Sequence, residues 1–107
     1  MTKRALNQAT AMQKEMNETM WKQLRYILST NYDVRSEDES EIWLKTSQDG
    51  VSLEVYPSND GVNLVHITVW SLKGGYGSLN RSQGIDTLPK AIEHIDRIIQ
   101  AMSVLVI

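Results

Sequence analysis

Three short runs in which apolar and polar residues alternate occupy the middle of the chain, within residues 41–70. They are rich in β-branched and aromatic residues, and two Asp-Gly pairs, Asp49-Gly50 and Asp60-Gly61, separate them. Alternation with a period of two predicts strands that bury one face, and an Asp-Gly pair between two such runs predicts a tight hairpin. The pattern therefore predicts an antiparallel meander.

The residues also predict how the first hairpin pairs. With a two-residue turn at Asp49-Gly50, Leu44 lies opposite Val55 on one face. The same turn sets Trp43 opposite Tyr56 on the other face. Aliphatic and aromatic residues then gather on separate faces, which is what a correct cross-strand pairing tends to give.

For the second hairpin we expect a three-residue loop that ends at Gly61, with this glycine in the left-handed conformation. Such a loop sets Val55 opposite Val65 on the aliphatic face. On the other face it sets Glu54 opposite His66.

One helix is predicted before this meander in the chain and another after it. Residues 4–30 contain no Gly or Pro and carry an apolar stripe at helical spacing: Ala5, Ala9, Met12, Met16, Met20, Leu24 and Ile27. The polar residues 1–9 are the part most prone to fraying. A second helix is predicted after a cap at Asp86 or Thr87, with Pro89 in its first turn. Its buried stripe is Leu88, Ile92, Ile95, Ile99 and Met102.

A first strand is predicted at Tyr32–Arg35, joined to the meander by the acidic loop Ser36–Ser40. Residues 72–84 are predicted as a long glycine-rich loop. The expected fold class is therefore α+β in two layers, with a four-stranded antiparallel meander sheet and both helices on one sheet face. At 107 residues the chain is expected to form a single domain, 1–107.

Composition narrows the functional classes. The chain has no cysteine, and its net charge of −2 comes from interspersed acidic and basic residues. Thiolate chemistry is thereby excluded, and a broad electrostatic nucleic-acid binder is disfavoured. No apolar run is long enough to span a bilayer, so we expect a cytoplasmic protein with no membrane partner.

The sheet face opposite the helices is the main candidate site. It is expected to present Trp43, Tyr56, Leu64, His66 and Trp70. Exposed apolar patches of this kind usually mark interfaces, unless a helix or the glycine-rich loop covers them as a second small core. We therefore expect a small non-enzymatic binding or regulatory module, inhibitor- or adaptor-like, that binds a protein partner. The apolar C-terminal residues 104–107 add a second adhesive surface, which favours a homo-oligomer such as a homodimer.

The glycine-rich loop supports an alternative. Lys73, Tyr76 and Arg81 beside Gly74, Gly75 and Gly77 could contact phosphates and stack a base, as in a nucleic-acid or nucleotide-phosphate binding protein. Their spacing matches neither a P-loop nor a dinucleotide fingerprint.

A remote alternative is a phosphoesterase. His66-Ile67-Thr68 resembles half of the active-site motif of the two-histidine phosphoesterases, in which two His-x-Thr tripeptides grip a phosphate ester. The chain has one such tripeptide, and its other histidine, His94, falls on the predicted second helix. The sequence therefore predicts no enzyme, no catalytic residue, no metal site and no cofactor.

Overall fold

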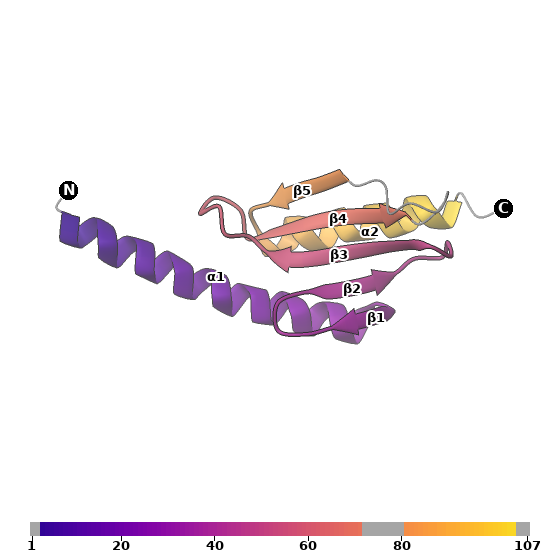
Figure 1. Cartoon of the computed structure of the whole chain (residues 1–107), viewed down its shortest axis with the longest axis horizontal. Coiled ribbons are helices and arrows are strands. Elements are labelled where there is room, and N and C mark those ends of the chain that lie inside the picture. Colours follow the sequence, from indigo (N-terminus) through magenta and orange to yellow (C-terminus); the bar gives the residue numbers. More distant parts are fainter. Residues whose placement is uncertain (1–2, 72–80, 105–107) are drawn as a thin grey trace.

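The computed structural model describes residues 3–71 and 81–104, in which two helices pack against one sheet (Figure 1). The elements in chain order are α1 (Lys3–Asn31), β1 (Val34–Glu37), β2 (Ile42–Lys45), β3 (Val51–Pro57), β4 (Val65–Ser71), β5 (Arg81–Ile85) and α2 (Leu88–Val104). The strands form one antiparallel sheet in the order β1-β2-β3-β4-β5.

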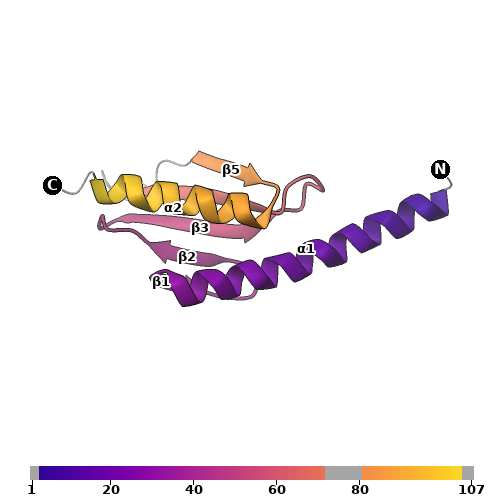
Figure 2. The ribbon, with the colours of Figure 1, turned by 180° about the vertical axis from the view of Figure 1, so that it is seen from behind.

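Both helices cover the same face of the sheet. The sheet lies in front of α2 and α1 in Figure 1, and the helices lie in front of the sheet in the reverse view of Figure 2. The predicted α+β fold with two layers is confirmed. We call the helix-covered side the inner face and the opposite side the outer face.

The core lies between the inner face and the helices. Its buried residues are Trp21, Leu24, Leu28, Ile42, Leu44, Leu53, Val55, Leu64, Val65, Ile67, Ile85, Ala91 and Ile95. The strand residues predicted to face the helices are among them, because the period-two alternation fixes which side chains share a face.

Helix α1 extends well beyond the sheet, and its first half contacts no strand in either view (Figures 1 and 2). Trp21, Leu24 and Leu28 pack into the core. Met12 and Met16, which were predicted on the buried stripe, are 63% and 56% exposed. The prediction of a helix is correct, but its buried stripe is wrong in the first half, because the sheet is too short to cover it.

Helix α2 begins as predicted. Thr87 is its cap: the Thr87 hydroxyl accepts a hydrogen bond from the Lys90 amide (3.3 Å), and the Thr87 carbonyl accepts one from the Ala91 amide (3.0 Å). The hydroxyl of Tyr32, just after α1, donates to the Asp96 carboxylate on α2. This contact joins the two helices at the end of the sheet.

The first hairpin differs from the predicted pairing by two residues. Leu44 pairs with Leu53 rather than with Val55. The turn itself is in its predicted place, with Gly50 left-handed at φ 82°. The extra residues are taken up before the turn, where the Thr46 hydroxyl lies 3.0 and 3.1 Å from two carbonyl oxygens of the loop. A shift of two keeps every side chain on its predicted face.

The second hairpin is shifted in the same way. Val55 pairs with Ile67 rather than with Val65. Gly61 is left-handed as predicted (φ 78°), but the loop is wider than three residues. The Asp60 carboxylate stabilises the wider loop by accepting hydrogen bonds from the two backbone amides that follow Gly61 (2.9 and 2.8 Å).

A fifth strand replaces part of the predicted glycine-rich loop. β5 pairs with β4 along its whole length, with Ile85 opposite Val65. The prediction of four strands was wrong here, because β5 is an edge strand with a single buried aliphatic residue. Its sequence, RSQGI, carries little β-propensity of its own.

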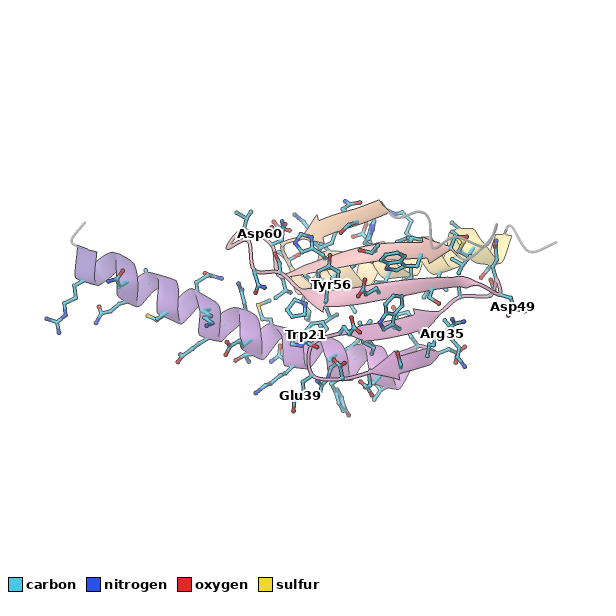
Figure 3. The ribbon with its side chains drawn as sticks, viewed as in Figure 1. Trp21, Arg35, Glu39, Asp49, Tyr56 and Asp60 are labelled. Atoms are coloured by element: carbon cyan, nitrogen blue, oxygen red, sulfur yellow. The ribbon has the colours of Figure 1, made fainter. Side chains whose placement is uncertain are left out.

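β1 also begins and ends later than predicted, at Val34 and Glu37. The acidic hairpin loop that follows is held by α1. The Trp21 indole donates to the Glu39 carbonyl (3.0 Å), and Arg25 donates to the Asp38 carbonyl (3.0 Å). Figure 3 shows Trp21 and Glu39 together at this loop.

Candidate binding surface

The outer face is lined by side chains from β2, β3 and β4 that alternate with core residues. Trp43, Glu54, Tyr56, His66 and Trp70 lie there and are all half-buried. Figure 3 looks onto this face and shows Tyr56 standing on β3. Five residues were predicted to line this face from the sequence. Four of them do so, namely Trp43, Tyr56, His66 and Trp70, and Leu64 does not.

Leu64 lies in the core instead. Its side chain is 2% exposed, and its backbone amide donates to the Ile85 carbonyl on β5 (2.7 Å). The wider second loop places Leu64 just before β4 begins, where it turns inward. The expectation that Leu64 lines the outer face was wrong, because it assumed a strand that starts earlier.

Trp43 and Trp70 form an aromatic pair at the centre of the outer face. Their ring centroids are 6.2 Å apart and their planes are inclined by 39°. This falls within the range in which aromatic rings attract each other. Ser52 on β3 and Thr68 on β4 belong to the same face, and each is only 5% exposed. The sheet around the pair is therefore already largely removed from water.

Glu54 lies directly opposite Trp43 and is bound to the other tryptophan. The Trp70 indole N–H donates to Glu54 Oε1 at 3.0 Å. Burial raises the pKa of the Glu54 carboxyl, a hydrogen bond with the Glu41 carboxyl raises it further, and the Trp70 hydrogen bond opposes the rise. The Glu54 carboxyl group is therefore held between the Glu41 carboxyl group and the Trp70 indole, beside the aromatic pair.

Tyr56 and His66 form a second aromatic pair on the same face. They lie opposite each other on β3 and β4, and their rings stack with centroids 5.5 Å apart and an angle of 28°. His66 Nε2 lies 3.0 Å from the Ser58 hydroxyl and 3.6 Å from Asp60 Oδ2. The loop between β3 and β4 therefore fixes the imidazole.

Ser58, His66 and Asp60 are the residue types of a catalytic triad, but their geometry is different. In a triad the nucleophile and the carboxylate bind different nitrogens of the imidazole: one nitrogen takes the proton of the nucleophile, and the carboxylate on the other holds the ring in the right tautomer. Here both contacts go to Nε2. The Asp60 carboxylate is also engaged with backbone amides, and these hydrogen bonds lower its pKa strongly. These three residues therefore hold the loop between β3 and β4 in place.

The second His-x-Thr half-site is not formed by His94. His94 lies on α2, in the layer that covers the inner face, whereas His66 lies on the outer face (Figure 2). Burial lowers the pKa of His94, and nearby Arg97 lowers it further. Thr68 is buried, which leaves its hydroxyl little access to a phosphate ester.

Three predicted site residues cannot be placed on this surface. Lys73 and Tyr76 lie outside the described residues, and of Arg81 only the backbone, at the start of β5, is described. Among the residues that sequence reasoning did not select, Glu41, Glu54, Ser58 and Asp60 hold the aromatic side chains in place. The alternation in β3 placed Glu54 on the correct face, but no sequence signal identified the contact with Trp70.

Several classes of site are not found in the described part of the chain. No group of three His, Cys, Asp or Glu residues there could hold a metal ion. Neither helix, over the residues searched, has the length and hydropathy of a membrane span. No protein-family model matches the chain, and comparisons with curated proteins and with solved structures find no match.

Proposed function

We propose that the protein is a small non-enzymatic binding module, of the inhibitor or adaptor type, that binds a protein partner through its outer face. The observation that carries this proposal is the pair Trp43–Trp70, half-buried on a sheet face that neither helix covers. Tryptophan and tyrosine are enriched at the energetic centres of protein interfaces, where they bury a large area at low entropic cost. Tyr56 continues the surface toward the loop between β3 and β4 (Figure 3).

The polar groups of the outer face support binding over catalysis. Ser58, His66 and Asp60 bind one another. Trp70, Glu54 and Glu41 do the same. Side chains fixed in this way lose little freedom when a partner docks, which favours affinity.

The nucleic-acid alternative stays a prediction with less support. The outer face carries the carboxyl groups of Glu41, Glu54 and Asp60 beside its aromatic rings, and carboxylates repel phosphates. Retention on single-stranded nucleic acid that weakens steeply with salt would favour this alternative.

The first half of α1 supports the accompanying proposal that the protein is a homodimer. Four exposed apolar residues there follow the alternating spacing of four and three that is typical of a coiled-coil seam, and two polar residues continue the same spacing toward the sheet: Ala5, Ala9, Met12 and Met16, then Thr19 and Gln23. A shallow groove runs along the stretch from Met12 to Gln23.

A second copy of α1 fits this seam in an antiparallel arrangement. A two-fold axis near Lys14 sets Met12 against the partner's Met16. The small residues Ala5 and Ala9 then meet the larger seam residues near the sheet. Interfaces of this kind use the same surface on both subunits and close after two copies. The C-terminal residues 105–107, the other predicted adhesive segment, lie outside the described residues.

Capture of the natural partner tests the binding function. Tagged protein is used to co-purify partners from the native host, read by mass spectrometry, with Trp43→Ala and Trp70→Ala as variants. We expect each variant to lose the partner at least tenfold, because interface tryptophans of this kind contribute about 2 kcal/mol or more. Tyr26→Ala, which removes a residue that is 70% exposed on α1, is the matched control. Equal capture by all four proteins, measured where circular dichroism shows them folded, would contradict the proposal.

Sedimentation equilibrium tests the homodimer. We expect a dimer at about 100 μM and a shift to monomer in Met12→Glu, because a charge in the seam is costly to bury. Ala11→Glu adds the same charge one residue earlier, about 100° around the helix and off the seam. A wild-type monomer, or a dimer that survives Met12→Glu, would sink this arrangement.

A further inference from the structure

Neither carboxyl group beside the tryptophan pair has a basic partner in the described part of the chain. The ion pairs there join Arg25 to Glu37, His66 to Asp60, Lys90 to Asp86 and Arg97 to Glu93. Glu41 and Glu54 instead hydrogen-bond to each other. Two carboxyl groups in contact at a half-buried position repel each other when both are charged, and so present a local demand for a cation.

The position of Glu54 ties this demand to the aromatic rings. It lies opposite Trp43 on β2, and Trp70 on β4 lies opposite Ser52, two residues before Glu54 on β3. The hydrogen bond from the Trp70 indole fixes Oε1 of Glu54 next to the ring. Because an indole N–H points outward in the ring plane, this oxygen lies at the edge of the ring. A cation that lies over the π-face near that edge can pair with Glu54 and is attracted by the ring quadrupole at the same time.

The separation of the rings decides where the cation lies. To hold a planar group between two parallel rings, the rings must stand about 7 Å apart, twice the contact distance of carbon atoms. Trp43 and Trp70 are 6.2 Å apart and inclined, so nothing fits between them. The cation must lie against the outward side of a ring, with its edge toward Glu54.

A guanidinium group matches this arrangement better than an ammonium group. It is planar, stacks on aromatic rings, is weakly hydrated, and offers a fork of N–H donors to a carboxylate. An ammonium group is a compact point charge that keeps its hydration and cannot stack. Lys45 lies on the same face, opposite Ser52, and none of the ion pairs of the described residues joins it to Glu41 or Glu54. The two carboxyl groups next to the rings therefore attract basic side chains of a partner.

We propose that the outer face binds an arginine side chain of the protein partner, with the guanidinium stacked on an indole of the Trp43–Trp70 pair and paired with Glu54. This assignment rests on the proposed binding function and names the chemistry of its partner. Glu41, whose carboxyl group contacts that of Glu54, supplies a second carboxyl group at the same place.

NMR of the indole N–H groups tests the assignment directly. The probe is the peptide acetyl-Gly-Arg-Gly-amide, added at constant ionic strength, and compared with the same peptide carrying citrulline or lysine. For one stacked ion pair we expect a dissociation constant on the order of 1–10 mM, seen as a saturable shift of the Trp70 indole signal. Citrulline, which is neutral and nearly isosteric, should bind at least tenfold more weakly, and lysine at least threefold more weakly.

Glu54→Gln is the decisive variant, because the glutamine amide oxygen can still accept the Trp70 hydrogen bond while the charge is gone. We expect at least tenfold weaker binding of the arginine peptide. Glu18→Gln makes the same charge change on an exposed residue of α1 and should leave binding unchanged. No shift with the arginine peptide, equal shifts with citrulline or lysine, or full binding to Glu54→Gln would each overturn the assignment.

Two outcomes separate this assignment from the binding function itself. If natural partners are captured through Trp43 and Trp70 but Glu54→Gln captures them equally, the partner binds the aromatic surface without an arginine, and only the assignment fails. If Trp43→Ala and Trp70→Ala capture partners as well as wild type, both proposals fail together.

Discussion

Ser52 and Leu53 are neighbours on β3 and both are buried, but they lie on opposite faces of the sheet. Leu53 is surrounded by the aliphatic core between the inner face and the helices. Ser52 lies on the outer face, with Trp70 and Lys45 opposite it on the two neighbouring strands. The inner face is held by packing that has no preferred direction, whereas the outer face is held by contacts that fix individual atoms.

The difference shows how one small sheet separates stability from recognition. Burial of aliphatic side chains supplies most of the free energy of folding. The contacts of Trp70, Glu54 and His66 add less stability, but they determine the positions of the groups that a partner would meet. A substitution on either face should therefore affect mainly one of these two properties.

The largest expected effect comes from the inner face. Leu53→Ala should lower the free energy of unfolding by about 2–5 kcal/mol, because it leaves a cavity at a fully buried position. Thermal unfolding followed by circular dichroism should show a midpoint lower by more than about 10 °C.

The matched substitution on the outer face is Ser52→Ala. It shortens an adjacent, equally buried side chain by one hydroxyl group, and we expect a loss of at most about 1 kcal/mol. A loss as large as that of Leu53→Ala would mean that the two faces contribute alike to stability, and the comparison would break down.

The inner face was also the part that could be predicted from the sequence. Alternation along β2, β3 and β4 assigned Leu44, Leu53 and Val55 to the core correctly, because side-chain direction depends only on the period of a strand. The exact pairing was missed by two residues in both hairpins. The Thr46 hydroxyl donates and the Asp60 carboxylate accepts hydrogen bonds that stabilise these wider loops. Such side-chain hydrogen bonds cannot be predicted from the turn residues in the sequence.

The predictions from the sequence were incomplete for the outer face and for α1, and the causes differ. Trp43, Tyr56, His66 and Trp70 were placed on the outer face correctly, since this again needs only the period. The contact of Glu54 with Glu41 could not be predicted, because it depends on a diagonal approach between strands. The spacing of Met12 and Met16 predicted a helix correctly but could not show that the sheet ends before it reaches them.

The smallest expected effect concerns the raised pKa of the Glu54 carboxyl group. The pKa of Glu54 is raised in the folded protein, so at a pH just above the ordinary glutamate value of about 4.3 the folded state still holds a proton that the unfolded state has released. The free energy of unfolding must therefore fall as the pH rises through this window. Asp38 and Asp60 act in the opposite direction at lower pH, because hydrogen bonds lower their pKa values in the folded state.

Comparison of wild type with Glu54→Gln isolates the contribution of the Glu54 carboxyl group. Glutamine does not titrate, so the stability of the variant relative to wild type should increase as the pH rises from 4 to 7. Urea unfolding at several pH values measures this difference, and the other ionisable groups of the outer face, Glu41, Lys45 and His66, are present in both proteins. Glu41→Gln should flatten the same part of the wild-type profile, since Glu41 is the hydrogen-bond partner that helps to raise the Glu54 pKa. A difference that stays constant with pH would show that folding does not raise the pKa of Glu54, and the local demand for a cation on the outer face would lose its electrostatic basis.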